Sequence, residues 1–371
     1  PRTLSSGALQ RHLDVDAQAV MHHVGSDEGA ISALYTSLAD RRRAVLLFGV
    51  CALFMSLLVD VATGPALLPI TAVVGSVLRL AKDPTVDAIV WTIRLPTAFV
   101  AIAVGAALGL SGGIMQTILN NPLASSYTLG VSAGAGFGAA LVIVLGVVVP
   151  LPEAWAIPVM SFLFAGLACA GVYGIGSLRG ASPEMLVLGG IALLFLFQAL
   201  LALLQFAASP EALQQIVFWL FGSLQKATWA KLWIISIVLG VALPLLLVDA
   251  WRLTALKLGD DRARGLGVDV ARLRLRAFAI ISALTGVAVA FVGTIGFVGL
   301  VAPHIARMLV GEDQRGLLPA SAVCGALLLS LASIASKSVL PGAIVPIGIV
   351  TSLIGVPFFV WLVTRSRRAF W

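Results

Sequence analysis

Long apolar runs, separated by short polar breaks, are the feature that most restricts the fold of this chain. Hydrophobic residues make up 60% of its 371 residues and charged residues only 11%, whereas an ordinary soluble domain carries about 25% charged residues. So few polar residues cannot cover soluble domains of this total length. A helix that crosses a bilayer needs about 20 apolar residues. The sequence therefore predicts an all-α, polytopic membrane protein with about ten transmembrane helices, and it excludes a soluble enzyme.

The polar breaks set the expected boundaries of these spans. A polar extension, residues 1–43, precedes a membrane domain, residues 44–371, which contains a polar insert at about 249–276. A short amphipathic stretch from Pro210 to Phe221 follows the fifth span. The ten spans are expected at residues 44–62, 96–117, 128–149, 155–177, 185–206, 229–248, 277–294, 297–310, 317–336 and 346–364.

The distribution of basic residues predicts the orientation. Arg41–Arg43 precede the first span, and basic residues beside a span mark its cytoplasmic side. Most of the 24 Lys and Arg residues then fall on inner segments, including the polar insert. We therefore expect both termini, the N-terminal extension and the insert to be cytoplasmic. Because the net charge of +7 is spread between apolar runs, a nucleic-acid partner is not expected.

Sequence patterns typical of catalysis or metal binding are missing. The chain has no G-x-x-x-x-G-K-[ST] loop for ATP phosphates. Cys51, Cys169 and Cys324 lie far apart inside apolar runs, without disulfide or metal spacing, and His304 is interpreted as structural. No catalytic site, metal site or permanent cofactor is expected. No acidic residue lies near the middle of an expected span, which disfavours an ion-gradient-coupled secondary transporter but leaves it as the alternative.

Two segments favour transport. The first is the break Asn120–Ala124 between two spans rich in small residues. Small residues permit close helix packing, and a broken backbone in a membrane protein must face protein or a cavity. A plain inter-helix turn explains this break equally well. The second segment, Leu258–Val268, has mixed charge and several glycines, which predicts one or two short helices on the membrane surface. They form either an interfacial loop or a docking surface for a cytosolic partner.

Together with residues 293–307 and 346–359, these segments occur in an order that resembles the permease family of ATP-driven importers for iron–siderophores, haem and vitamin B12. The resemblance covers about residues 45–365. It implies a B12-importer-permease-like fold, a homodimer around a central pathway, two cytosolic ATPase subunits that use the ATP, and a periplasmic substrate-binding protein. It also implies the bacterial inner membrane. The chain looks most like haem-import permeases, so the expected cargo is haem, or else a ferric siderophore or corrinoid.

The resemblance also implies site residues. Pro183 stands where the B12 importer has small hydroxyl residues, and Thr97 stands where the family has a second Arg. Ile344 and Val345 take the place of a usual Glu. The implied translocation gate is Asn121, Pro122, Leu123, Ser182 and Pro183; the implied ATPase contact is Gly259, Asp260, Asp261, Ala263, Arg264, Leu266 and Gly267; the implied cations for docking the binding protein are Arg94 and Lys337.

Overall fold

The computed structural model describes residues 39–365, except 66–67, 81–82, 147–151, 179 and 341. This part of the chain is helical and contains no strand. Seven of its helices are long and apolar enough to cross a membrane, and three shorter apolar helices accompany them. They occupy the positions of the ten expected spans, so the predicted all-α membrane fold is confirmed.

The first helix, Ala39–Ala62, begins five residues before the expected span and includes Arg41–Arg43. Most of the N-terminal extension lies outside the described residues. After the first helix come α2 (Ile70–Val77), α3 (Pro84–Ile89), the π-helical turn η1 (Val90–Arg94), α4 (Leu95–Ile118), α5 (Val131–Leu145), α6 (Glu153–Ser177), α7 (Pro183–Ala207), α8 (Pro210–Leu220), α9 (Trp229–Val248), α10 (Ala250–Leu256), α11 (Asp260–Gly265), α12 (Val270–Val292), α13 (Val298–Val310), α14 (Gln314–Ser338) and α15 (Ile347–Arg365).

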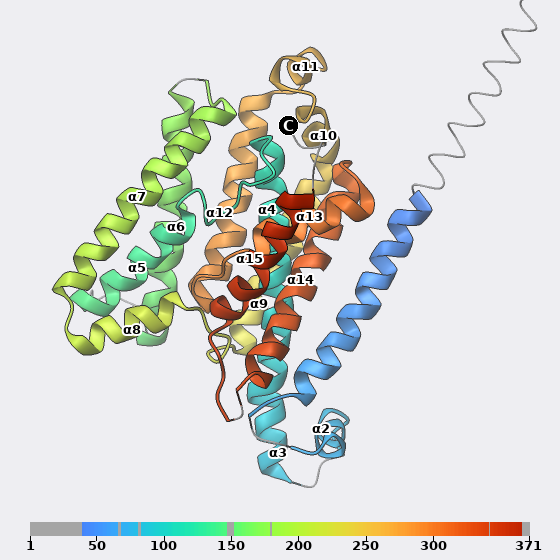
Figure 1. Ribbon diagram of the computed structural model, residues 1–371, viewed down its shortest axis with the longest axis vertical. Helices are drawn as coiled ribbons and strands as arrows, with labels where there is room; N and C mark the ends of the chain where they lie inside the picture. Colours follow the sequence, from blue (N-terminus) through green and yellow to red (C-terminus); the bar gives the residue numbers. More distant parts are fainter. Residues whose placement is uncertain are drawn as a thin grey trace, which may run out of the picture.

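The helices define two ends of the molecule (Figure 1). The first helix begins at the end that carries α10 and α11, which we call the inner end. The opposite end carries α2 and α3, and we call it the outer end. Arg41–Arg43 and the polar insert thus share one end, as the predicted orientation requires. Which end faces the cytoplasm stays a prediction.

Helix α4 forms the centre of the bundle. It continues α3 and η1 in one helix, Pro84–Ile118, whose most apolar stretch is 83% buried, against 17–22% for the first helix, α7 and α9. Glycines let the neighbouring backbones approach α4 closely. A Cβ atom at Gly105 would lie 2.3 Å from the carbonyl oxygen of Gly325 on α14, and one at Gly112 would lie 1.8 Å from that of Gly299 on α13. The Gly-rich sequence of α4 is therefore a packing requirement.

A small outer layer, residues 63–94, was not assigned to any element by the sequence, because its apolar runs are too short for a span. It folds around an apolar cluster that includes Val73, Val86 and Val90. The indole N–H of Trp91 donates a hydrogen bond to the carbonyl oxygen of Ser76 at 3.1 Å. This layer covers the outer ends of the first helix and of α4.

Helix α5 is shorter than its expected span 128–149, whereas the short helix α13 matches its expected span 297–310 to within one residue. Helix α5 begins at Val131 rather than at 128, because Gly130 has a φ of 78° and interrupts the helix there. Helix α13 has only 13 residues and follows Phe297, a non-glycine residue with a φ of 66°. Both breaks leave irregular backbone inside the bundle, where it needs protein or a cavity beside it.

Candidate functional site

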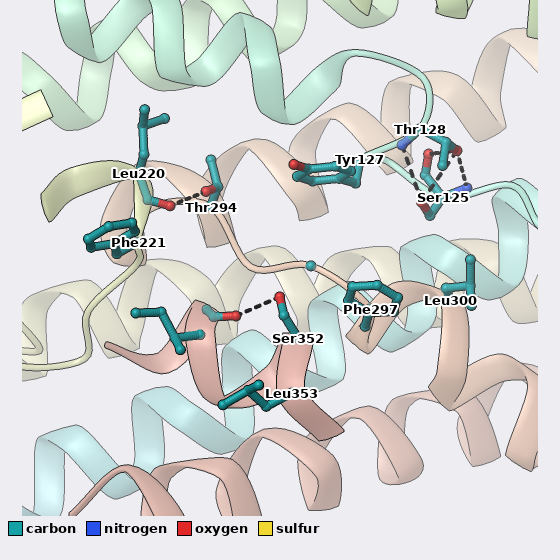
Figure 2. Close-up of a pocket in the computed structure, with 13 residues that line it drawn as sticks. Ser125, Tyr127, Thr128, Leu220, Phe221, Thr294, Phe297, Leu300, Ser352 and Leu353 are labelled. Atoms are coloured by element: carbon teal, nitrogen blue, oxygen red, sulfur yellow. Dashed lines mark hydrogen bonds between the residues drawn. The ribbon is translucent and has the colours of Figure 1, made fainter. Parts of the chain in front are cut away.

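A cavity of about 440 Å³ lies beside these breaks (Figure 2). Its wall is built from the loop before α5, the end of α8, the segment leading into α13, and the first turns of α15. It is lined by Ser125, Tyr127, Thr128, Leu220, Phe221, Thr294, Gly296, Phe297, Leu300, Gly348, Ile349, Ser352 and Leu353.

None of these 13 lining residues carries a charge, and the polar groups are five hydroxyls. Four of the hydroxyls bond to nearby groups. Thr128 Oγ1 donates to the carbonyl oxygen of Ser125 at 2.9 Å, and Ser352 Oγ donates to that of Gly348 at 2.8 Å. The Thr294 hydroxyl bonds to the Leu220 carbonyl oxygen. Tyr127 is half exposed, and among the described residues its hydroxyl has no hydrogen-bond partner. The wall is therefore apolar and weakly polar, with one hydroxyl available to a ligand.

Backbone hydrogen bonds fix the side of the cavity formed by α8, α12 and α15. The Gly348 N–H donates to the carbonyl oxygen of Phe221 at 3.0 Å, and the Ser223 N–H donates to that of Val292 at 2.7 Å. A Cβ atom at Gly348 would lie 2.5 Å from the same Phe221 oxygen. This part of the wall is held rigidly by main-chain contacts.

The first predicted gate turn is an Asx turn. Asn121 Oδ1 accepts a hydrogen bond from the Leu123 N–H at 2.9 Å, and the Asn121 N–H donates to the carbonyl oxygen of Gln116 at 3.1 Å. Leu123 is 43% exposed. The side chain of Asn121 thus stabilises the turn while Leu123 presents apolar surface.

The second predicted gate turn starts α7. Ser182 is its N-cap and accepts a hydrogen bond from the Met185 N–H at 3.4 Å, and Pro183 occupies the first helical position. A proline is well tolerated there, because a backbone N–H at the first helical position would have no acceptor inside the helix. The departure of Pro183 from the family pattern is therefore compatible with the turn. Whether the two turns gate a pathway stays a prediction.

The polar insert forms two short helices, α10 and α11, and α11 is the short helix that the sequence predicts within Leu258–Val268. Gly259, with a φ of 99°, and Gly267, with a φ of 82°, flank α11. The Asp261 carboxylate is almost fully exposed, and Arg264 Nη1 pairs with it at 2.9 Å. We expected Ala263 to contact a partner, but its side chain is buried in the core. The exposed apolar surface comes instead from Leu266, which is 51% exposed, and from its neighbour Leu258.

The two predicted docking cations lie inside the protein. Arg94 is 5% exposed, and its Nη1 donates to the carbonyl oxygens of Val61 and Ala62 at 3.0 and 2.9 Å. Lys337 Nζ lies 2.8 Å from the carboxylate of Asp60, which is fully buried. Both cations therefore hold the outer end of the first helix in this conformation. A contact with a binding protein stays a prediction.

Arg274 is a further residue of the inner end, which the sequence analysis counted only as an inner cation. Its side chain is 1% exposed and bonds to Asp260, to Ile118 and to Ala181. Its burial could have been predicted from helical periodicity. Val270, Leu273 and Ala277 lie on the buried face of α12, and Arg274 lies on the same face.

Comparison with known proteins decides the family. The model of the FecCD transport family matches residues 52–365. The chain belongs to the FecCD transport family. The resemblance predicted from the sequence is thereby confirmed, and the chain is a membrane permease of the ABC transporter type, a subunit class that is not itself catalytic.

Two relatives and one solved structure support this assignment. The iron(3+)-hydroxamate import permease FhuB of Bacillus subtilis is 37% identical over 87% of this chain and 84% of its own length. The hemin transport permease HmuU of Yersinia pestis is 37% identical over 75% of this chain and 84% of its own length. A metal-chelate type ABC transporter, solved in an inward-facing conformation, superimposes with a TM-score of 0.77 at 33% identity over 87% of this chain and 99% of that one.

Proposed function

We propose that this chain is the permease subunit of an ATP-driven importer that carries an iron chelate, with haem as the first candidate, across the bacterial inner membrane. The observation that carries the proposal is the uncharged cavity of about 440 Å³ beside two broken helices in a FecCD-family chain. A large, partly apolar chelate needs a wall without strong metal ligands, because a tight ligand would trap it. Among the lining residues there is no His, Cys or carboxylate.

The relatives support an iron chelate and do not choose among iron chelates, since one is named for ferric hydroxamate and one for hemin. The test is uptake into liposomes by the complex of this chain with its ATPase and binding protein. Haem, a ferric hydroxamate and cobalamin are offered in parallel, with and without ATP. ATP-dependent uptake of haem alone supports the finer proposal, uptake of the hydroxamate alone replaces haem, and uptake of none contradicts the proposal.

The alternative, a carrier driven by an ion gradient, has less support in the structure. The most buried acidic side chain in the described spans, Asp60, is paired with Lys337 near the outer end of the first helix and does not line the cavity. The purified chain alone, with an imposed proton or sodium gradient, would move cargo only if the alternative holds.

The proposed assembly is a homodimer with two cytosolic ATPases, a periplasmic binding protein and cytoplasmic termini. Leu353 lines the cavity and is 70% exposed, so a second copy of the chain would cover this apolar side chain and complete the wall. The exposed Leu266 of α11 would contact an ATPase. Leu266→Asp should then weaken co-purification of the ATPase, because it places a charge in an apolar contact. Val339→Asp at the outer end is the control, since Val339 is also an exposed apolar residue, 63% exposed against 51% for Leu266.

The proposed gate consists of Asn121–Leu123 and Ser182–Pro183 from both copies. A cysteine at position 123 should form a cross-link to the same position of the other copy, in a yield that changes with nucleotide. Leu123→Ala should leave assembly intact and raise ATP hydrolysis without uptake. Cross-linking that is absent or identical in all nucleotide states would favour a plain structural turn.

Docking of the binding protein is proposed for the outer end. Arg94 and Lys337 could contact a partner only after the outer end of the first helix moves, whereas Lys226 is exposed in this conformation. Charge reversal at Lys226 should slow association at low salt. Lys337→Glu breaks the buried pair with Asp60, so its association is measured on the folded fraction alone. If that folded fraction associates more slowly than the Lys226 variant, the cations implied by the resemblance are the docking residues.

A further inference from the structure

Arg274 is a fully buried cation whose partners come from three different parts of the chain. Its Nη1 and Nη2 lie 2.7 and 2.8 Å from the two carboxylate oxygens of Asp260 on α11. Its Nε donates to the carbonyl oxygen of Ile118 at 3.2 Å, and Nη1 also donates to that of Ala181 at 2.9 Å. One side chain on α12 therefore binds α11, the end of α4 and the turn before α7.

These partners adjoin the proposed machinery. Ile118 is the last residue of α4, three residues before Asn121. Ala181, which has a φ of 54°, directly precedes Ser182. Asp260 is the first residue of α11, the helix that we propose contacts the ATPase. The guanidinium of Arg274 is thus a direct connection between the insert and both proposed gate turns.

The physics of a buried charge makes this connection stiff. A guanidinium and a carboxylate held in a two-pronged pair form a short, directional contact. Pulling Asp260 away would leave the charge of Arg274 uncompensated in the interior, which is far more costly than moving an exposed pair. At Gly259 and Gly267, which flank α11, nothing lies within 4 Å of the Cβ position. Ala263, in the middle of α11, is buried against the rest of the protein. Helix α11 and the groups bonded to Arg274 are therefore expected to move together.

We propose that Arg274 is a positioning residue that transmits displacement of α11 to both gate turns during transport. This inference rests on the proposed function of α11 and of the gate. The ATPase displaces α11, Asp260 carries Arg274 with it, and the carbonyl oxygens of Ile118 and Ala181 follow.

The test uses the assembled complex with its ATPase, with a spin label on a cysteine at position 123, so that the readout needs no cargo. Asp260→Asn keeps the size of the side chain and removes the charge that holds Arg274. The matched control is Asp313→Asn. Asp313 pairs with Arg42 at 2.7 Å at the same inner end and has a similar exposure, 30% against 24% for Asp260, but it does not contact Arg274.

With Asp260→Asn, we expect the ATP-driven change in label mobility to fall by about tenfold, a size typical of the coupling between two sites. The change is measured per complex that retains bound ATPase, so a weakened ATPase contact does not count as lost transmission. With Asp313→Asn, the change should stay at the level of the unsubstituted chain. A merely structural role of Arg274 would lower the amount of folded complex in the Asp260 variant but leave the response of the surviving complex intact.

Arg274→Lys decides the case in which Asp260→Asn fails to assemble. Lysine keeps the charge but cannot bind Asp260 through two prongs and both carbonyl oxygens together, so the response should again be reduced. A full response with Arg274→Lys, or with Asp260→Asn, would overturn the inference alone. If the unsubstituted complex hydrolyses ATP but the mobility of the label at position 123 does not change, the proposed gate is overturned. The inference about Arg274 is then overturned as well.

Discussion

Gly109→Ala should disrupt the central helix pair. A Cβ atom at Gly109 of α4 would lie 2.2 Å from the carbonyl oxygen of Ser321 and 3.1 Å from the Cα atom of Gly325, both on α14. These are backbone atoms and cannot rotate away. Ordinary contact begins at 3.4 Å, so the two helices would have to separate by about 1 Å at this level, as in an overpacked core.

The expected cost follows from two opposing effects. Overpacking of a well-packed interior costs about 1–3 kcal/mol. Alanine is favoured over glycine inside a helix by up to about 1 kcal/mol, which offsets part of that cost. The net loss of stability should be about 1–2 kcal/mol. Gly174→Ala is the control: nothing lies within 4 Å of its Cβ position on α6, so the same substitution should be neutral or slightly stabilising.

The assay is the fraction of monodisperse protein in detergent after heating, measured as a half-life because membrane proteins often unfold irreversibly. Gly109→Ala should shorten the half-life relative to the unsubstituted protein, and Gly174→Ala should not. Equal half-lives of the two variants would refute the claim that contact with α14, rather than helix propensity, requires glycine at this position.

Two further predictions concern the ends of the molecule. Asp60→Asn should destabilise the protein by about 3–5 kcal/mol in the same assay, because it leaves Lys337 as an unpaired buried charge; Asp40→Asn, in an exposed pair, should cost under about 1 kcal/mol, and similar losses would argue against a buried charge pair. Gly259→Ala should cost about 1–3 kcal/mol, since Gly259 has a φ of 99° and a ψ of 155°, values that favour glycine. Gly265→Ala, which has open space and no positive φ, should be neutral, and an equal effect of both would contradict the strain.

The membrane-spanning helices could be predicted from the sequence, because an apolar run of about 20 residues indicates a span by its length alone. Residues 63–94 escaped prediction because α2, α3 and η1 are short and stabilised by packing against the first helix and α4. The exact start of α5 depended on Gly130, whose positive φ is not evident in a run of small residues.

The order of motifs implied the proposed gate turns and the insert, but it did not predict where their side chains lie. Arg94 and Lys337 were expected at the outer surface because the resemblance implies them as docking cations. Their burial depends on partners far away in sequence, such as Asp60 for Lys337. Arg274 was missed for the same reason, since its partners Ile118 and Asp260 become neighbours only in the folded chain.

Most ion pairs of the inner end fall into two bonded groups, which are linked by the pair of Asp249, before α10, with Arg276 on α12 at 3.8 Å. Arg42–Asp313, Lys257–Glu312 and Arg307–Glu312 join the first helix, the segment after α10, α13 and the start of α14. Arg274 joins α11, α12, the end of α4 and the turn before α7. Along the chain, Lys257 belongs to the first group and Asp260 to the second, and Gly259 lies between them with nothing near its Cβ position. A force on α11 would therefore act most directly on the second group, which carries both proposed gate turns and reaches the first group through the partly exposed pair of Arg276 with Asp249.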